Sequence, residues 1–187
     1  KPIAISCGEP AGVGPEIAVR AWQALGETTP MVWIGDPRHL PQGTEIHETD
    51  DPTDHRKGKF TVLPRDFGSP ARHGSPDPAH AQGVIDAIAD AVDLVQKGAA
   101  RALCTAPIHK AALIDGADFA YPGHTEYLAA LAGTDQVVMM LACDALRVVP
   151  TTIHIPLAAV PQKLTASLLT DTLLITHAAM RRDFGIT

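Results

Sequence analysis

The chain contains 187 residues, of which 45% are hydrophobic and 19% are charged, and this composition excludes an intrinsically disordered chain. Lys and Arg number 15 against 21 Asp and Glu, so the net charge is −6, which argues against a broad basic face that binds nucleic acid. No apolar run reaches the ~18 residues of a membrane span, and no signal peptide is visible before the first predicted strand. We therefore expect neither nucleic-acid nor membrane partners.

Apolar runs bounded by Gly and Pro predict strands, whereas apolar residues at helical spacing predict helices. In chain order, these patterns predict a strand at 2–6, a helix at 15–25, strands at 31–34 and 60–63, a helix at 79–96, a strand at 102–105, helices at 111–113 and 125–132, a strand at 136–142, an extended segment at 146–155 and a helix at 161–184. The stretch 65–79 predicts a surface loop. Because strands alternate with helices and are apolar on both faces, the pattern favours an α/β fold with three layers (α/β/α) and a mainly parallel sheet.

Several side chains carry burial predictions. The helix at 15–25 is expected to be largely buried, Ile17 and Leu25 included, and the apolar stripe on the last helix is expected to be core or interface. The three cysteines (Cys7, Cys104 and Cys143) form no CxxC pair, so we expect buried thiols in a reducing, cytoplasmic compartment. Six histidines in polar loops or on a helix flank are expected to be exposed: His39, His47, His55, His73, His80 and His177.

The segment from Gly8 to Glu16 lies between a predicted strand and a predicted helix. Such a loop presents backbone N–H groups at the positive end of a helix, which suits an anion. It lacks the Gly-Lys-Ser/Thr of a P-loop, and Ile17 stands where the dinucleotide fingerprint needs its third glycine. Because Glu9 and Glu16 would repel a bound phosphate, a ligand-contacting loop and a tight structural turn both stay open.

Two further polar segments follow a predicted strand and a predicted turn. Thr105-Ala-Pro-Ile-His-Lys110 leaves a buried strand at the end where parallel sheets bind ligands, so Lys110 is either a ligand for phosphate or carboxylate or a solvated side chain. In Pro122-Gly-His-Thr-Glu126, a turn places His124 and Thr125 at a helix N-terminus. There His124 can donate to an anionic ligand, and Thr125 can act as an N-cap.

Thr151-Thr-Ile-His-Ile-Pro156 places one histidine, His154, in an otherwise apolar extended segment, where it is either a core residue or a ligand. Together with His109 and His124 it supplies imidazoles from loops at strand ends. A metal site needs three or more suitable protein ligands, and the sequence has neither an HExxH motif nor clustered acids. The sequence therefore indicates part of a metal site without completing one.

Five segments in this order resemble the 4-hydroxythreonine-4-phosphate dehydrogenases of vitamin B6 biosynthesis. They are Ile5–Glu16, Thr105–Lys110, Pro122–Glu126, Val137–Ala142 and Thr151–Pro156. Each motif alone is modest, whereas the five in order are highly specific. The family's chains are considerably longer, so this chain resembles their N-terminal portion.

The resemblance implies a fold similar to that of isocitrate and isopropylmalate dehydrogenases, with two α/β domains, a cleft between them and a homodimer that shares its active site between subunits. It implies a first α/β domain at 1–115 and the start of a second, dimer-forming domain at 116–187. The ending Phe184-Gly-Ile-Thr187 is typical of a helix stop followed by the approach to another strand. We therefore expect a chain that is incomplete at its C-terminus.

The implied activity is the NAD- or NADP-dependent oxidation of 4-phosphooxy-L-threonine, a phosphorylated hydroxy acid, followed by loss of CO₂ to give 3-amino-2-oxopropyl phosphate. A divalent metal ion (Zn, Mg or Co) would bind the substrate hydroxyl and lower its pKa. His124 and Thr125 match the family's substrate-contacting pair, and His154 matches the first of three metal-binding histidines. The other ligands and much of the nicotinamide site are expected beyond Thr187, so the 187-residue piece alone is expected to be inactive.

Two alternatives stay open. A related enzyme would oxidise another phosphorylated hydroxy acid, such as erythronate or threonate 4-phosphate, or a dihydrodiol carboxylate. A non-catalytic α/β module would only bind a ligand or dimerise, although polar residues at several strand ends argue against a mere scaffold. Divalent metal binding that is lost on His154→Ala would separate the enzyme from the module.

Overall fold

The computed structural model describes residues 1–134 and 136–186. The chain divides into two compact units, Lys1–His124 and Thr125–Thr187. The expected approach to a further strand at the end of the chain includes Thr187, which lies outside the described residues. No helix among the described residues is long and apolar enough to cross a bilayer.

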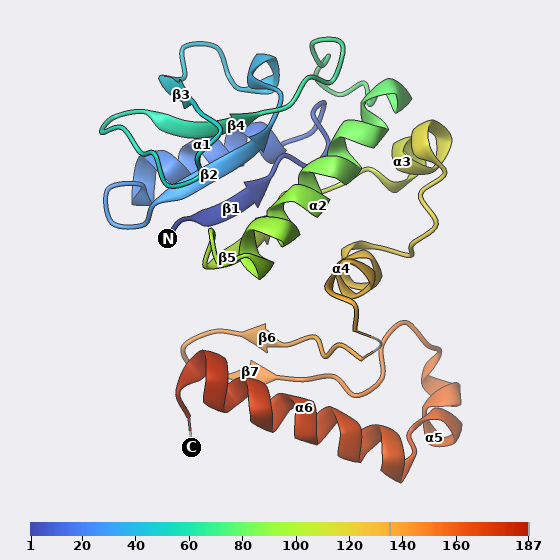
Figure 1. The fold of residues 1–187 in the computed structure, drawn as a ribbon. Helices are drawn as coiled ribbons and strands as arrows, with labels where there is room; N and C mark the ends of the chain where they lie inside the picture. Colours follow the sequence, from blue (N-terminus) through green and yellow to red (C-terminus); the bar gives the residue numbers. More distant parts are fainter. Residues whose placement is uncertain (135, 187) are drawn as a thin grey trace. The chain divides into compact units, whose positions relative to one another are not determined.

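A five-stranded parallel sheet forms the centre of the first unit (Figure 1). The strand order is β3-β4-β2-β1-β5, so the sheet extends on both sides of the first strand of the chain. The strands are β1 (Ile3–Ser6), β2 (Met31–Gly35), β3 (Ile46–Glu48), β4 (Phe60–Pro64) and β5 (Ala102–Thr105). Val32, Trp33 and Ile34 of β2 are fully buried, since helices cover both faces of the sheet. The predicted α/β fold is confirmed.

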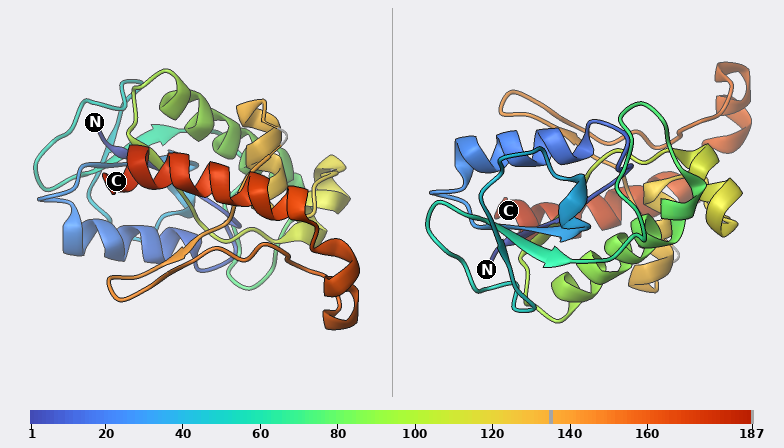
Figure 2. Two further views of the ribbon diagram at one scale, coloured as in Figure 1. Left: turned by 90° about the horizontal axis from the view of Figure 1, so that it is seen from below. Right: turned by 90° about the horizontal axis from the view of Figure 1, so that it is seen from above.

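Helices cover the sheet on both sides. α1 (Gly14–Leu25) and α2 (Ala81–Gln96) lie on opposite faces (Figure 2), and α3 (Lys110–Ala117) packs against α2. Two short 3₁₀ helices, η1 (Pro37–His39) and η2 (Pro78–His80), lead out of β2 and into α2.

The expectation that α1 is largely buried is wrong in part. Ala18 and Val19 are buried, but Ile17 is 46% exposed and Leu25 is 52% exposed. At 3.6 residues per turn, Ile17 lies on the side of the helix away from the buried stripe, and Leu25 ends the helix.

The histidine prediction holds for half of its residues. His55, His73 and His177 are exposed as predicted, whereas His39, His47 and His80 are buried, contrary to the prediction. Each buried ring has a polar partner that the local sequence does not reveal. His47 Nε2, for example, donates to the Asp54 carboxylate at 2.8 Å. Burial of a polar ring is tolerated when such a bond replaces water.

The cysteine prediction is correct for one residue of three. Cys7 is buried directly after β1, and burial raises the pKa of its thiol. Cys104 and Cys143 are exposed, because Cys104 lies on the edge strand β5 and Cys143 follows a two-residue strand. All three are free thiols.

The second unit contains far less regular strand than predicted. It holds most of α4 (His124–Ala132), the antiparallel pair β6 (Leu141–Ala142) and β7 (Arg147–Val148), η3 (Leu157–Ala159), α5 (Val160–Lys163) and α6 (Ala166–Phe184). Of the strand predicted at 136–142 and the extended segment predicted at 146–155, only two residue pairs form a ladder, Leu141 with Val148 and Ala142 with Arg147. The single helix predicted at 161–184 is two helices, because Thr165 is extended and its hydroxyl accepts the Leu168 N–H, which starts α6.

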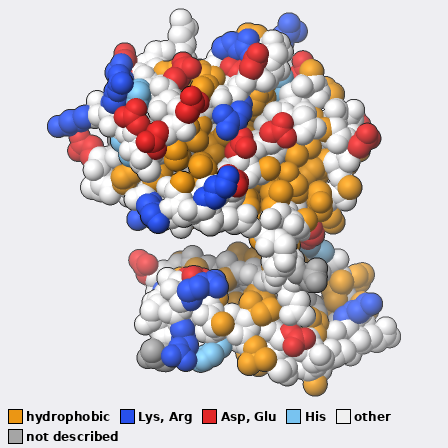
Figure 3. Space-filling model, in the orientation of Figure 1, with side chains coloured by type: hydrophobic (Ala, Val, Ile, Leu, Met, Phe, Trp, Pro, Cys, Tyr) orange, Lys and Arg blue, Asp and Glu red, His pale blue; other side chains and the backbone are white. Residues whose placement is uncertain are grey.

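Large apolar side chains of the second unit are exposed among the described residues, and some of them are visible as separate patches in Figure 3. In α6 only Thr172 is buried. The exposed apolar side chains of this unit include Leu141, Leu146, Val148, Leu157, Leu164, Leu168, Leu169, Leu173, Leu174 and Phe184. The stripe predicted on the last helix is therefore not core within the unit, and an exposed stripe of this kind is typical of an interaction surface.

Candidate functional site

Polar residues follow four neighbouring strands at the carboxyl edge of the sheet. β1, β2, β4 and β5 end level with one another, since Ser6 pairs with Ile34 and Thr105, and Gly35 pairs with Pro64. The residues that come next along this edge are Cys7–Val13, Asp36–His39, Arg65–Ser69 and Ala106–Lys110. Open parallel sheets bind ligands at this edge, so these four segments define the candidate site.

The loop between β1 and α1 is a tight structural turn. Gly8 has φ +66°, and a Cβ there would lie 2.4 Å from the Pro107 carbonyl oxygen, so only glycine fits. Glu9 is buried, its backbone N–H donates to Pro107 O at 2.8 Å, and its carboxylate accepts the Ala11 N–H at 2.9 Å. The carboxylate of Glu9 thus takes a backbone donor that an anionic ligand would otherwise use. Of the two alternatives for this loop, the geometry favours the turn.

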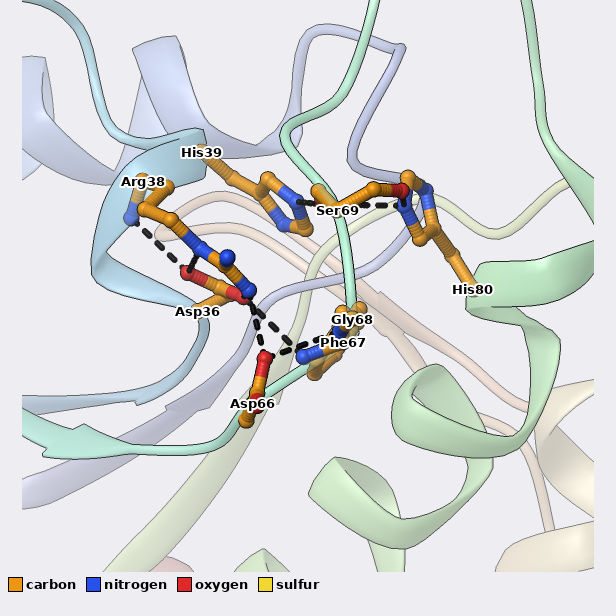
Figure 4. Close-up of polar contacts among 8 residues, drawn as sticks. All are labelled: Asp36, Arg38, His39, Asp66, Phe67, Gly68, Ser69 and His80. Carbon is orange, nitrogen blue, oxygen red and sulfur yellow. Dashed lines mark hydrogen bonds and ion pairs between the residues drawn. The ribbon is translucent and has the colours of Figure 1, made fainter.

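After β2, the side chain of Asp36 joins two loops (Figure 4). Asp36 is 1% exposed, and its Oδ1 accepts the backbone N–H and the Nε–H of Arg38, both at 2.9 Å. Its Oδ2 accepts the Phe67 backbone N–H at 3.0 Å, and the Arg38 guanidinium also bonds Asp66. Although burial alone raises the pKa of Asp36, the bonds from Arg38 and Phe67 lower it to about 2. We call Asp36, Arg38 and Asp66 the aspartate clasp.

Beside the clasp, two buried histidines share one acceptor (Figure 4). His39 Nε2 and His80 Nε2 each lie 3.0 Å from the Ser69 carbonyl oxygen. The centroids of the two imidazole rings are 5.0 Å apart. A carbonyl accepts only, so each Nε2 carries the proton and each Nδ1 presents a lone pair. Both Nδ1 atoms are buried without a partner among the described residues. Burial lowers the pKa of His39, which favours the neutral ring.

In the segment after β5, His109 has a structural role, whereas the side chain of Lys110 is exposed to solvent. His109 caps α3, because its Nδ1 accepts the Ala112 N–H at 3.2 Å. Lys110 begins the helix and its side chain is exposed. A solvated Lys110 and an anion-binding Lys110 are both compatible with this position.

The structure brings Lys110 close to His124. Burial, and then the charge of Lys110, lower the pKa of His124, which favours the neutral ring. His124 Nε2 is buried and has no hydrogen-bond partner among the described residues. Thr125 follows in the first turn of α4 and is half-buried. A buried polar atom without a partner is rare in proteins, and a substrate group would satisfy it.

His154 lies in the second unit, in a bend rather than in the predicted extended segment. Its side chain is exposed, and its backbone has φ +57°, in the left-handed region that costs a non-glycine residue about 1 kcal/mol. Within residues 1–134 and 136–186, no three His, Cys, Asp or Glu side chains are grouped as a metal site requires. The described chain thus offers His154 as a single donor.

The sequence pattern missed the aspartate clasp and the histidine pair. One signal was present: Asp36-Pro37 directly follows a predicted strand, at the same end of the sheet as the Thr105–Lys110 segment. The contacts themselves join residues about 30 positions apart, such as Asp36 with Phe67 and His39 with Ser69, so no local pattern reveals them.

Comparison with known proteins gives one family. The family model described as pyridoxal phosphate biosynthetic protein PdxA matches residues 27–187. The chain is 63% identical over 189 residues to the 4-hydroxythreonine-4-phosphate dehydrogenase of Roseobacter denitrificans, and 55% identical over 188 residues to that of a Ruegeria species. Each alignment covers 99% of this chain and 58% of the relative. The chain thus spans little more than half the length of the curated relatives that it matches.

Solved structures of the same class of enzyme have the same fold. The 4-hydroxythreonine-4-phosphate dehydrogenase of Klebsiella pneumoniae superposes with a TM-score of 0.88 at 30% identity and covers 97% of this chain and 59% of its own. That of Burkholderia phymatum superposes with a TM-score of 0.84 at 31% identity and covers 95% of this chain and 57% of its own.

Proposed function

The chain belongs to the family of the pyridoxal phosphate biosynthetic protein PdxA. We propose that its protein is a dehydrogenase that oxidises 4-hydroxythreonine 4-phosphate, which is the same compound as 4-phosphooxy-L-threonine. The observation that carries the proposal is the 63% identity over 99% of the chain to a relative of that name. The polar segments that follow β1, β2, β4 and β5 agree with this proposal, because open parallel sheets bind ligands at the carboxyl edge where these segments lie.

The proposed reaction has two stages. The carbon that bears the secondary hydroxyl gives a hydride to NAD or NADP, and the hydroxyl gives up its proton. The resulting β-keto acid then loses CO₂ to form 3-amino-2-oxopropyl phosphate. The cofactor supplies the hydride chemistry, while the protein supplies binding and orientation.

We assign substrate binding to His124 and Thr125. His124 carries a buried Nε2 that needs a partner, and a hydroxyl or carboxylate of the substrate would provide one. The nearby charge of Lys110 favours an anionic substrate, because a cation at the start of a helix adds to the positive end of the helix dipole. Thr125 offers a hydroxyl in the same turn.

We propose His154 as one ligand of a divalent ion (Zn, Mg or Co). The described residues do not complete such a site, so the other ligands would come from outside them. When bound, the ion would lower the pKa of the substrate hydroxyl and stabilise the charge that develops on it. The left-handed backbone of His154 fits this role, since strained residues concentrate at ligand sites.

We also propose that the protein is a cytoplasmic homodimer whose active site is shared between subunits. The exposed leucines of α6 (Leu168, Leu169, Leu173 and Leu174) support dimerisation, because large exposed apolar side chains gathered on one element are typical of protein–protein contacts. The three free thiols support a reducing compartment.

The test is an assay of reduced nicotinamide formation with the complete protein, 4-hydroxythreonine 4-phosphate and either NAD or NADP. We expect turnover that requires a divalent ion and that is abolished by His154→Ala, while His177→Ala, another exposed histidine of the second unit, keeps it. Preference for erythronate or threonate 4-phosphate would assign a different substrate. No turnover with any of these acids would refute the dehydrogenase.

A further inference from the structure

The first unit contains a cavity of about 620 Å³ that is remote from the candidate site. It lies at the amino end of the sheet, where β2 begins at Met31 and β4 passes through Thr61. The end of α1 and the loop between β3 and β4 form its other walls. Its volume falls within the range of pockets that hold small ligands, about 300–1,000 Å³.

One wall of the cavity is a fixed aromatic surface. The Trp22 ring stacks on Phe60, with centroids 5.4 Å apart and planes inclined by 26°. Phe60 is fully buried, whereas Trp22 remains half-exposed and lines the cavity. The indole also lies against Gly26, where a Cβ would come within 2.5 Å of Trp22 Cδ1. The ring is thus held in place with part of its surface free, which suits stacking of a flat ligand.

Another part of the lining is cationic, although the chain carries a net charge of −6. Arg56, Lys57 and Lys59 line the cavity and are exposed. In the described part of the chain, neither lysine takes part in an ion pair. Glu27 is the one carboxylate of the lining. Such a local excess of cations raises the concentration of anions at the cavity.

We propose that this cavity binds a flat aromatic ring that carries a phosphate group, with the ring stacked on Trp22 and the phosphate at Lys57 and Lys59. The Glu27 carboxylate would accept hydrogen bonds from amino or hydroxyl groups of the ring. Two sources share this chemistry: a purine nucleotide, and pyridoxal phosphate, which the family description names as the product of the pathway. The site is additional to the proposed active site and shares no residue with it.

The test is isothermal titration calorimetry of the purified protein with four probes: AMP, pyridoxal phosphate, adenosine and inorganic phosphate. We expect AMP or pyridoxal phosphate to bind more tightly than either adenosine or inorganic phosphate, because only the first two join a ring to a phosphate. Whichever binds identifies the source. If neither binds, or if inorganic phosphate binds equally well, the proposal is wrong.

Charge-reversed variants locate the binding. Lys57→Glu/Lys59→Glu should weaken binding by about tenfold or more, since two attractive charges become repulsive. The matched control, Arg72→Glu/Lys97→Glu, makes the same change in net charge at exposed residues outside the lining and should leave affinity unchanged. Equal affinity in both variants would place the ligand elsewhere, including a nicotinamide-nucleotide site, and would overturn the proposal.

A second pair of variants tests the aromatic wall without relying on charge. Trp22→Ala should abolish binding, whereas Trp22→Phe keeps a ring for stacking and should retain most of it. Far-UV circular dichroism of each variant checks that the first unit is folded. Retention of full affinity in a folded Trp22→Ala variant would refute the stacking role.

Discussion

Replacing Asp36 by Asn is expected to lower the free energy of unfolding of the first unit by about 2 kcal/mol at pH 7. The Asp36 carboxylate is buried, and its bonds from Arg38 and Phe67 lower its pKa from 3.8 to about 2. At about 1.4 kcal/mol for each pKa unit, this difference corresponds to about 2 kcal/mol of folding free energy. Asn keeps the shape of the side chain and removes the charge.

The pH dependence makes the prediction specific. The pKa of Asp36 is lower in the folded than in the unfolded protein, so its contribution is complete above about pH 4 and disappears as the pH falls from 3.8 towards 2. The difference in unfolding free energy between wild type and Asp36→Asn should therefore shrink to about 1 kcal/mol at pH 3. Other carboxylates titrate in both proteins and cancel in this difference.

Urea unfolding followed by tryptophan fluorescence measures this difference. Both tryptophans, Trp22 and Trp33, belong to the first unit, so the signal reports on that unit. Asp66→Asn is the matched control, because Asp66 bonds the same Arg38 but its side chain is 82% exposed, and such a pair contributes less than ~1 kcal/mol. A difference that stays the same at pH 7 and pH 3, or an equal loss in Asp66→Asn, would refute the reasoning.

Three further predictions follow from the candidate site. Gly8→Ala should lower the free energy of unfolding of the first unit by at least ~2 kcal/mol in urea unfolding, because the added Cβ would meet Pro107 O. Gly43→Ala is the control: its φ is also positive, at +84°, but the added Cβ meets no atom, so it should cost only the smaller free energy of the unfavourable backbone conformation. In the complete enzyme, His124→Ala should raise the KM for 4-hydroxythreonine 4-phosphate about tenfold with a smaller effect on kcat, whereas an unchanged KM would contradict substrate contact. The 187-residue chain alone should form no NADH or NADPH, because its described residues supply only His154 to the proposed metal site, and measurable formation would contradict the proposed need for further ligands.

The strands of the first unit were predictable where they are buried on both faces. β1, β2 and β4 read as continuous apolar runs, which the sequence shows directly. β3 was missed because Ile46–Glu48 is short and includes two polar residues, and it is a strand only through its pairing with β4. Strand propensity depends on such partners more than on the segment itself.

In the second unit, a predicted strand is largely lost because it has few pairing partners. The run Gln136–Ala142 is apolar and rich in strand-forming residues, yet only Leu141 and Ala142 pair, and they pair with β7. An apolar run alone does not supply the neighbouring backbone that a strand needs. α5 and α6 are separate helices because the Thr165 hydroxyl caps the start of α6. The leucines at helical spacing continue through this position, so their pattern predicts one uninterrupted helix.

Part of the candidate site was visible in the sequence, but its contacts were not. Lys110 and His124 were each recognised as polar residues near a helix start, whereas their electrostatic coupling needs the fold. His39 and His80 were predicted to be exposed, and they are buried because one carbonyl, that of Ser69, accepts from both rings. The roles of His124, Thr125 and His154 stay predictions.

Hydrogen bonds divide the connection between β4 and α2 into several short segments, each held at its ends. Phe67 is bonded to Asp36, Ser69 to two histidine rings, and the Gly74 N–H to the carbonyl of Ala11 at 2.9 Å. The entropy of loop closure grows only with the logarithm of length, so each later anchor closes a few residues at little additional cost. Loss of one anchor therefore frees only the few residues beside it, whereas release of the whole connection requires every anchor to break. Amide hydrogens in this segment would then exchange mainly through small local openings rather than through release of the whole loop.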